Sequence, residues 1–281
     1  MNSEVTNETQ MKQLKAIELD LLNIFIKSCE KLNLKYYVIG GTLLGAVRHQ
    51  GFIPWDDDID VAMPREDYEQ WVRKAPDIIN NDTYFVQSFL SEPNYLANFA
   101  KLRNSKTTFI EKSLRKLNIN HGIYIDIFPL DYHSTKNKIF KLKQFFYTSK
   151  ILSAYDMDAI DYPKYKKFLR QFAAIFVPGK PFEAVVKREK LYQSAKTGNF
   201  LANYNGAWGD KEIIPKEWYG DGTHLTFEGV DIIAPQKYSE WLTQVYGNYM
   251  ELPPVEKRVT HHFTDVIDLN KSYKEYWGIN K

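Results

Sequence analysis

Residues 36–64 read YYVIGGTLLGAVRHQGFIPWDDDIDVAMP, and this stretch decides the fold. An apolar strand over residues 36–39 leads into the glycine turn Gly40-Gly41, and a helix over residues 42–50 follows. After a break at a glycine and a proline, a second strand begins in a cluster of carboxylates. The turn and the carboxylates together predict a site for a metal ion and a phosphate group.

The carboxylates of the second strand are spaced for metal binding. Asp58 and Asp60 are two residues apart, so on an extended strand they project together while the apolar residues between and after them point to the core. Neighbouring carboxylates repel each other, and Mg²⁺ is the best candidate to lie between them because it prefers oxygen ligands and accepts phosphate as well. Asp56 and Asp57 are expected to support this pair, although the register leaves Asp56 and Asp58 as an alternative pair.

The glycine turn is the predicted phosphate-binding element. At the start of a helix, the backbone N–H groups around Gly40, Gly41 and Thr42 can approach a phosphate with no glycine side chain in the way. Arg48 lies about two turns further along the helix. It either contributes charge to the phosphate site or is a solvated residue at the helix end.

A third acidic position interrupts a run that is typical of a buried strand. The run GIYIDIFPLD spans residues 122–131 and places Asp126 among β-forming apolar residues. Because an unpaired charge in a buried strand is costly, we expect Asp126 to face a metal ion or the rim of the site. Tyr124 lies on the same face by parity and would form an aromatic wall. Asp131 follows Pro129 and is expected to be a turn or cap residue.

Two basic residues lie in or next to a predicted strand over residues 98–102. Lys101 and Arg103 are two apart, so they would share one face of an extended segment. There they could pair with phosphate oxygens and neutralise the charge that develops on a leaving nucleotide. The alternative is an exposed strand edge protected by basic residues.

Composition limits the classes of function. The chain has 281 residues, 44% of them hydrophobic, which is enough for one large domain with a core. A net charge of +2 gives no reason to expect nucleic acid as a partner. Cys29 is the only cysteine, which excludes an intrachain disulfide and a zinc site of several thiolates. No apolar run follows Met1, so we expect neither a signal peptide nor a membrane anchor, and a cytoplasmic location.

The chain is expected to form one core with a helical insertion. Residues 1–132 would contain the core and its carboxylates, residues 133–197 the insertion, and residues 198–281 the part that completes the core and the substrate site. Elements expected from periodicity are helices over residues 11–32, 65–74 and 236–246 and a hairpin that turns at Glu228 and Gly229. The first of these helices is expected to serve packing and not chemistry.

Four strings along the chain form an ordered pattern. They are GGTLLGAVRH at residues 40–49, IPWDDDID at 53–60, FAKLR at 99–103, and LPP at 252–254 followed by Lys257, Arg258, His261 and His262. This pattern resembles the LicD family, the phosphocholine transferases of bacterial surface glycans, whose relatives include the fukutin proteins. The resemblance implies an α+β, nucleotidyltransferase-like core with a mixed sheet flanked by helices.

The resemblance also implies a reaction, the transfer of a phosphoryl group. A hydroxyl of a cell-surface glycan or teichoic acid precursor, such as a lipid-linked glycan, would attack the distal phosphorus of CDP-choline, and CMP would leave. One or two Mg²⁺ ions held by Asp58, Asp60 and Asp126 would bridge the phosphates. Asp126 would accept the proton of the hydroxyl, because it comes from a different strand than the metal pair.

Further site residues follow from the same resemblance. Lys257, Arg258, His261 and His262 would close over the nucleotide or the acceptor, and the two adjacent histidines do not predict zinc because no third nitrogen or sulfur ligand is near. Aromatic faces hold quaternary ammonium groups. The candidates for such a choline cage are Trp55, Tyr124, Trp208, Trp218 and Tyr219.

Three questions stay open from the sequence alone. The donor could be another CDP-linked alcohol such as CDP-ribitol, with the same fold and metal site. A nucleotidyltransferase in the strict sense would release pyrophosphate and not CMP. The lysines and aromatic residues of the insertion either make a peripheral contact with an anionic membrane or form a solvated face.

Overall fold

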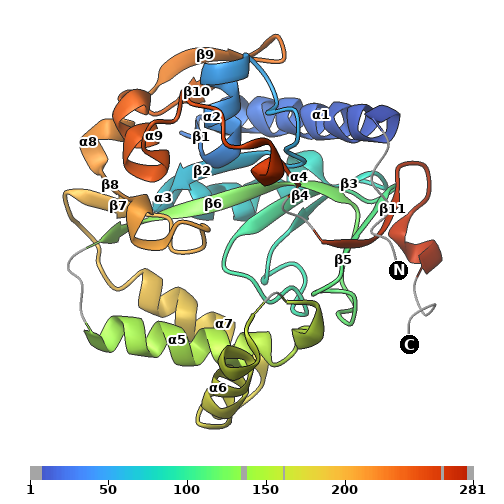
Figure 1. The fold of residues 1–281 in the computed structure, drawn as a ribbon, viewed down its shortest axis with the longest axis vertical. Coiled ribbons are helices and arrows are strands. Elements are labelled where there is room, and N and C mark those ends of the chain that lie inside the picture. The colour runs from blue at the N-terminus through green and yellow to red at the C-terminus, as the bar shows by residue number, and fades with distance from the viewer. Residues whose placement is uncertain (1–7, 134–137, 161, 261–262, 277–281) are drawn as a thin grey trace.

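The centre of the molecule is a mixed β-sheet (Figure 1). The structure is a computed structural model that describes residues 8–133, 138–160, 162–260 and 263–276. The sheet has the strand order β1-β2-β6-β4-β3; in addition, β7 pairs with the last residues of β6, and β8 pairs with β7. The strands are β1 (Tyr37–Val38), β2 (Asp60–Pro64), β3 (Tyr84–Gln87), β4 (Ala100–Asn104), β6 (Ile123–His133), β7 (Phe200–Ala202) and β8 (Ile213–Pro215). β2 and β6 run parallel and the other neighbours antiparallel, so the predicted α+β class with a mixed sheet is confirmed.

Two further pairs of strands lie outside this sheet. β5 (Thr108–Glu111) pairs with β11 (Thr264–Asp268), and β9 (Thr223–Phe227) pairs with β10 (Val230–Ala234). The β9–β10 hairpin turns at Glu228 and Gly229, whose φ angles are +50° and +79°. Two successive residues in the left-handed region suit the right-handed twist of a hairpin, so the predicted hairpin is confirmed.

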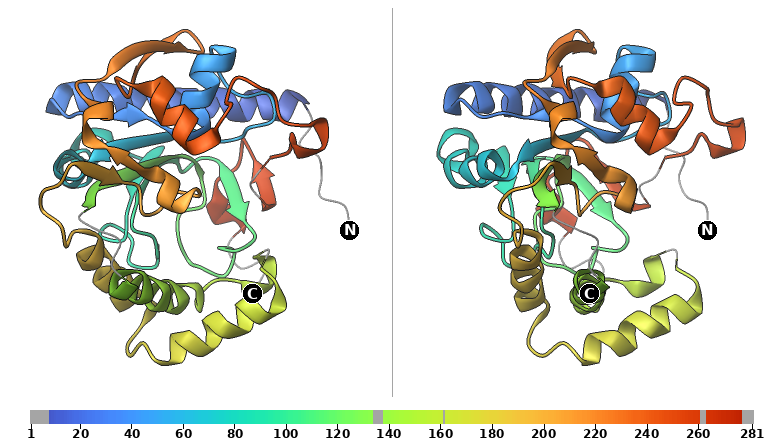
Figure 2. Two further views of the ribbon diagram at one scale, coloured as in Figure 1. Left: turned by 60° about the vertical axis from the view of Figure 1, so that its left-hand side comes forward. Right: turned by 90° about the vertical axis from the view of Figure 1, so that its left-hand side faces the viewer.

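Helices lie on both sides of the sheet region. They are α1 (Glu8–Leu32), α2 (Gly40–His49), α3 (Arg65–Lys74), α4 (Pro76–Ile79), α5 (Lys138–Leu152), α6 (Lys164–Ile175), α7 (Pro181–Tyr192), α8 (Lys216–Tyr219) and α9 (Tyr238–Tyr246). α1 and α3 pack directly against β6, whereas α5, α6 and α7 form a separate layer at the opposite end of the molecule (Figures 1 and 2). Within the described residues, no helix combines the length and apolar character needed to cross a membrane.

The main core lies between α1, α3 and the sheet. Leu21 and Phe25 of α1 are fully buried, and the ring of Phe25 meets that of Trp71 from α3 at 5.4 Å. The indole N–H of Trp71 donates to the hydroxyl of Ser28 at 2.8 Å, so the one polar atom of this ring is satisfied. Each such large side chain contributes about 1.5–3 kcal/mol by leaving water, and together they hold α1 across the sheet.

β6 continues further than the sequence indicates, and the expectation that Asp131 is a turn or cap residue is wrong. Pro129 does not end the strand, because it lies between the end of the pairing with β4 at Ile127 and the start of the pairing with β7 at Asp131. On that side its missing N–H costs no ladder hydrogen bond. Asp131 is therefore a buried strand residue.

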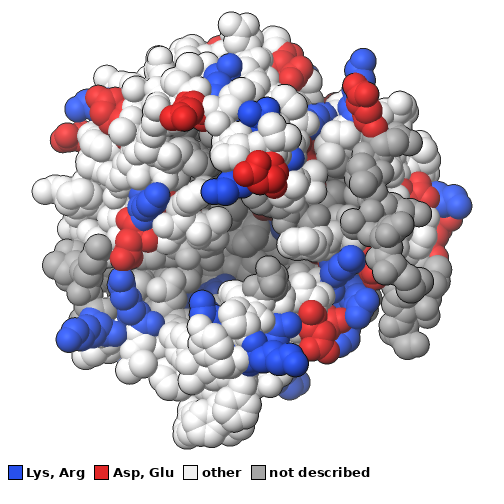
Figure 3. Space-filling view, viewed as in Figure 1, with Lys and Arg blue, Asp and Glu red and all other residues white. Residues whose placement is uncertain are grey.

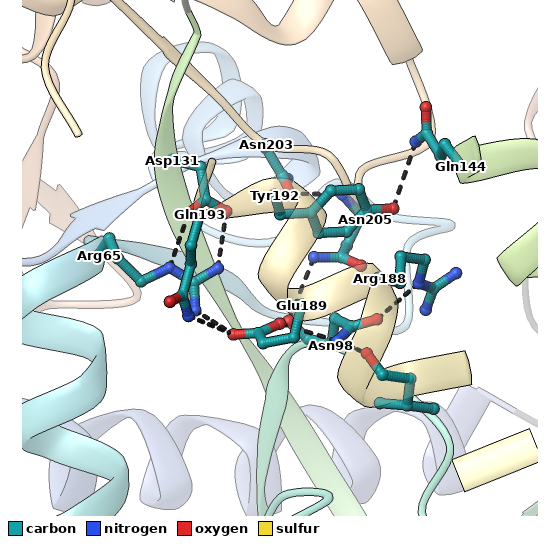
Figure 4. A network of polar contacts seen from close by, with 11 residues as sticks. Arg65, Asn98, Asp131, Gln144, Arg188, Glu189, Tyr192, Gln193, Asn203 and Asn205 are labelled. Carbon is teal, nitrogen blue, oxygen red and sulfur yellow. Dashed lines mark hydrogen bonds and ion pairs between the residues drawn. The ribbon is translucent and has the colours of Figure 1, made fainter. Parts of the chain in front are cut away.

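A polar network joins the sheet to the helical layer (Figure 4). Arg65, the first residue of α3, binds both carboxylate oxygens of Asp131 at 2.7 and 2.6 Å and also pairs with Glu189 of α7. Glu189 accepts a hydrogen bond from the side-chain amide of Asn98 at 2.8 Å, and the Asn98 carbonyl oxygen accepts one from Arg188. One continuous set of buried charges and amides thus fixes α7 to the core.

Candidate active site

Two of the predicted carboxylates lie side by side on neighbouring strands. Asp60 begins β2 and is the register partner of Asp126 in the parallel strand β6. The backbone N–H of Asp126 donates to the carbonyl of Ile59 at 2.9 Å, which locks this register. The strand pairing therefore brings together two acids that are separated by 66 positions in the sequence.

The glycine turn lies against the carboxylates of Asp60 and Asp56. Gly40 has a φ of +58°, and a Cβ atom added to it would lie 2.7 Å from a carboxylate oxygen of Asp60. A Cβ atom on Gly41 would collide with the carboxylate of Asp56. The hydroxyl of Thr42 accepts a hydrogen bond from the backbone N–H of Asp60 at 2.8 Å. The three residues predicted to bind phosphate thus also position the acidic side chains.

The group best arranged to hold a metal ion lies directly before β2. Asp56, Asp57 and Asp58 each offer an oxygen, and these three atoms lie within 4.8 Å of one another. Carboxylate oxygens are the ligands that Mg²⁺ prefers, and a divalent cation would offset the repulsion among them, so the residues fit this ion. The group includes the alternative pair Asp56 and Asp58. Asp60 and Asp126 are not part of this group. Metal binding by Asp58, Asp60 and Asp126 together therefore stays a prediction.

The electrostatic environment of Asp60 links the two sets of acids. Burial raises the pKa of its carboxyl well above the usual range, and the charges of Asp58, Asp126 and Asp56 raise it further. A carboxyl under this repulsion is stabilised in its ionised form by any cation bound nearby. The site is therefore prepared for positive charge.

Helix α1 packs against the sheet as expected, and it also places two ionisable side chains, Lys15 and Glu18, close to the aspartates. That this helix takes no part in the chemistry stays a prediction. The ammonium of Lys15 donates to the carbonyls of Ile53 and Pro54 at 3.0 and 3.1 Å and so holds the loop before the aspartates. Glu18 is 2% exposed, and burial together with the nearby Asp58 and Asp57 raises its pKa. The signal was available, since Glu18 falls on the apolar stripe of this helix.

Lys101 of β4 is the cation next to Asp126. Its ammonium lies 2.9 Å from a carboxylate oxygen of Asp126 and 3.7 Å from Glu111, and it is 4% exposed. The ring of Tyr124 lies 3.2 Å away, measured to its centroid, and that of Phe99 lies at 5.5 Å. The structure thus brings Lys101 to the acids, inside the aromatic wall that the sequence predicts.

Two other predicted cations are held by protein groups. Arg103 shares the face of Lys101, with its guanidinium 4.7 Å from the Tyr124 ring centroid, but it donates to the carbonyl of Gly122 and the side chain of Gln87 in the interior. Arg48 donates to the carbonyl of Tyr249 at 2.9 Å and ties α2 to the C-terminal segment. The structure does not bring either residue to the carboxylates.

The C-terminal segment reaches the site at Trp55. The guanidinium of Arg258 lies 5.4 Å from the centroid of the Trp55 ring, and it also donates to the carbonyl of Pro253. Lys257 is exposed at the end of a short 3₁₀ helix. His261 and His262 lie outside the described residues.

The five aromatic residues predicted for a choline cage do not form one group. One face of Tyr124 is covered by Lys101, and Tyr219 is buried in the core against Tyr37. Trp218 packs partly buried against the main core. Trp55, which precedes Asp56, and Trp208, which packs against Tyr246, remain as rings with exposed surface.

Tyr246 and Glu212 are site residues that sequence reasoning missed. The ring of Tyr246 meets Trp208 edge-on at 5.1 Å, and burial and the charges of Asp60 and Asp56 raise its pKa. Glu212 accepts hydrogen bonds from the backbone N–H of Trp208 at 2.9 Å and from Asn203 at 2.8 Å. Burial raises the pKa of Glu212 to about 7. No local pattern marks either residue, because the tertiary fold alone brings them to the acids.

Comparison with known proteins first gives the class of the fold. A family model described as "LicD/FKTN/FKRP, nucleotidyltransferase domain" matches residues 33–157. The match spans the glycine turn, the aspartates of residues 56–60, Lys101 and Asp126, so it covers the acidic centre of the site. Residues 33–157 therefore match a nucleotidyltransferase domain.

Similarity over the whole chain then gives the family. The chain is 30% identical over 277 residues to the "Lipopolysaccharide cholinephosphotransferase LicD" of Haemophilus influenzae, which covers 91% of this chain and 97% of that protein. It therefore belongs to the LicD family. Shorter segments are similar to two uncharacterized proteins. The chain is 42% identical over 67 residues to a protein of Rickettsia typhi, which is 22% of each chain. It is 62% identical over 37 residues to a protein of Rickettsia prowazekii, which is 13% of this chain and 14% of that protein.

Proposed function

We propose that the protein transfers phosphocholine from CDP-choline to a hydroxyl group of a cell-surface glycan or teichoic acid precursor, with Mg²⁺ as cofactor and CMP as the second product. The proposal for the transferred group is supported by the similarity to a lipopolysaccharide cholinephosphotransferase over nearly the whole of both chains. We place the reaction in the cytoplasm, at the inner face of the membrane where a lipid-linked acceptor would be met.

The observation that carries the chemistry is the convergence of Asp60, Asp126 and the group Asp56, Asp57 and Asp58 at the glycine turn. Bound Mg²⁺ would supply charge neutralisation for the phosphate oxygens and lower the pKa of the acceptor hydroxyl. Asp56, Asp57 and Asp58 would hold it, with Asp60 beside them.

The other residues would position the reacting groups. The acceptor oxygen forms a bond to the distal phosphorus while the bond from that phosphorus to the CMP oxygen breaks, and the hydroxyl proton passes to Asp126. Lys101 orients the carboxylate of Asp126 through their ion pair. Arg258 would be the cation that meets the nucleotide, and its position over the ring of Trp55 supports this role.

The contacts of the aromatic residues support a second candidate donor. Because Tyr124 and Tyr219 are occupied by protein contacts, fewer rings are left for a quaternary ammonium than the sequence indicates. A CDP-linked polyol such as CDP-ribitol needs no such cage, and the metal site would serve it equally.

The experiment is a comparison of donors with Mg²⁺ and an envelope-glycan extract. CDP-choline, CDP-ribitol and a nucleoside triphosphate are incubated separately, and the nucleotide product is identified. We expect CMP from CDP-choline, reduced at least about a hundredfold in Asp58→Ala. The exposed Asp77→Ala of α4 is the control and should keep full activity. CMP from CDP-ribitol alone would change the transferred group, and pyrophosphate from the triphosphate would overturn the reaction.

A further inference from the structure

Helix α6 presents its large apolar side chains to the outside of the protein. They are Tyr165, Phe168, Leu169, Phe172, Ile175 and the following Phe176, each between 51% and 75% exposed. The rings form a row, with Phe168 and Phe172 stacked at 6.5 Å and Phe172 and Phe176 edge-on at 5.1 Å. Helix α6 lies at the lower edge of the molecule in Figure 1, away from the sheet, and the surface at that edge is white in Figure 3.

The arrangement is the reverse of an ordinary surface helix. The six residues recur at helical spacing and form one continuous apolar stripe, which a globular protein normally turns to its core. Here the buried side consists of Ala173 and Ala174, with Val177 after the helix end. Arg170 also points inward, with its guanidinium over the rings of Phe145 and Tyr162 at 5.2 and 5.4 Å. The inner side is thus already packed. Among the described residues the stripe stays at least half exposed, and its contact with a ring of another helix is that of Phe176 with Phe146 at 6.5 Å.

The charged residues within the segment that carries this stripe are all basic, although the acidic Asp158 lies next to Lys167. Between residues 162 and 182 the sequence contains Lys164, Lys166, Lys167, Arg170 and Lys180 and no Asp or Glu. α5, which packs against α6, contains four lysines and no acidic residue. Figure 3 shows several Lys and Arg side chains above the white lower edge, with Asp or Glu side chains beside some of them. The chain as a whole is nearly neutral at +2, so this cationic character is local.

We propose that α6 is an interfacial helix that lies in the plane of an anionic lipid bilayer. Its apolar stripe would enter the boundary between headgroups and acyl chains, while the flanking lysines extend to the lipid phosphates. A second copy of this chain fits less well, because it would bring the same cationic helix opposite itself. The proposal concerns a surface distant from the acids and does not depend on which group the enzyme transfers.

The first test measures binding to vesicles. The full chain is sedimented with vesicles of phosphatidylcholine and phosphatidylglycerol, or of phosphatidylcholine alone. We expect binding to the anionic vesicles that weakens as salt is raised, and a triple variant Phe168→Ser, Phe172→Ser, Ile175→Ser that binds at least about tenfold more weakly. The matched control Leu90→Ser with Val255→Ser removes equally exposed apolar residues from other surfaces and should bind like the unchanged protein.

A second measurement locates the contact. Cys29 is the only cysteine and is buried, so a cysteine introduced at an exposed position can be labelled alone with an environment-sensitive dye. Ile175→Cys should show a blue shift of emission when anionic vesicles are added, and Leu90→Cys should not. Equal binding by the triple serine variant, no shift at position 175, or a dimer that the triple variant abolishes would each overturn the proposal.

Discussion

At Gly40, the absence of a Cβ atom lets the carboxylate of Asp60 lie against the glycine turn. The φ of +58° at Gly40 disfavours any side chain, and a Cβ atom would meet Asp60. Gly40→Ala should therefore lower the free energy of unfolding by about 1–2 kcal/mol and also weaken Mg²⁺ binding, measured by urea unfolding and calorimetric titration. Gly247→Ala separates the two effects, because φ there is +76° but no atom lies within 4 Å. It should cost stability alone, and an equal loss of Mg²⁺ affinity in both variants would contradict the assignment.

Glu212 predicts a pH dependence of stability. Its folded pKa of about 7 lies above the usual value of 4.5, so between these values the folded protein binds more protons than the unfolded chain. The contribution of Glu212 to stability therefore falls as pH rises from about 4.5 to 7, by up to about 3 kcal/mol. Urea unfolding at several pH values should show this decline in the unchanged protein.

The comparison for this prediction is Glu212→Gln, which cannot titrate. Gln can accept only one of the two hydrogen bonds that Glu212 accepts, so a constant loss is expected at every pH. The decline with pH should become smaller. A variant that declines as steeply as the unchanged protein would assign the effect to another group, and Glu240→Gln on the exposed side of α9 controls for the loss of one charge.

Between strands, the pairing of β4 with β6 leads to a prediction for Lys101. Lys101→Met removes the cation that lies between Asp126 and Glu111 and leaves their charges in a largely buried site. We expect the free energy of unfolding to fall by about 3–5 kcal/mol, measured by urea denaturation at neutral pH.

A double variant shows whether this loss arises from charge. Lys101→Met combined with Asp126→Asn should recover a large part of the stability, because Asn carries no charge, while activity stays absent. If the double variant is no more stable than Lys101→Met alone, the role of Lys101 is packing against Tyr124 and Phe99.

The elements that could be predicted from sequence are those set by near neighbours along the chain. The alternation of Ile59 and Val61 with the acids, the proline before α3 and the turn at Glu228 and Gly229 all act within a few residues. The same holds for the glycine turn, whose position next to the acids follows from one strand and one helix.

What could not be predicted depends on how distant elements meet. The partner of Lys101 follows from the register of β4 on β6, and the approach of Glu18 to the aspartates from the way α1 crosses the sheet. The prediction for Asp131 was wrong because a proline such as Pro129 usually ends a strand. Here β6 continues, because Pro129 lies between the segment that pairs with β4 and the segment that pairs with β7, where no partner needs its N–H. Arg48 and Arg103 carry the right charge, but the fold uses them for hydrogen bonds of its own.

For the molecule as a whole, Arg65 links the layer of α5, α6 and α7 to the core through its ion pairs with Asp131 and Glu189. Arg65→Met would leave Asp131 and Glu189 buried together without their cation, and burial already raises the pKa of both carboxyls. The free energy of unfolding should fall by about 3–5 kcal/mol at neutral pH and by less in acid, where the carboxyls are protonated. Arg73→Met removes only a surface pair with Glu69, and urea unfolding should show a change of about 0.5 kcal/mol or less. Equal effects of the two variants would show that the network does not hold the layers together.

The same network has a geometric consequence if α6 rests on a bilayer. Arg65 follows β2, the strand that begins with Asp60, and binds Glu189 in the layer to which α6 belongs. The acids that we propose as catalytic would then stand at a fixed height above the lipid surface, set by the packing of the two layers and not by a flexible linker. Under the proposed function, the hydroxyl groups of a membrane-anchored glycan would then be selected by their distance from the anchor.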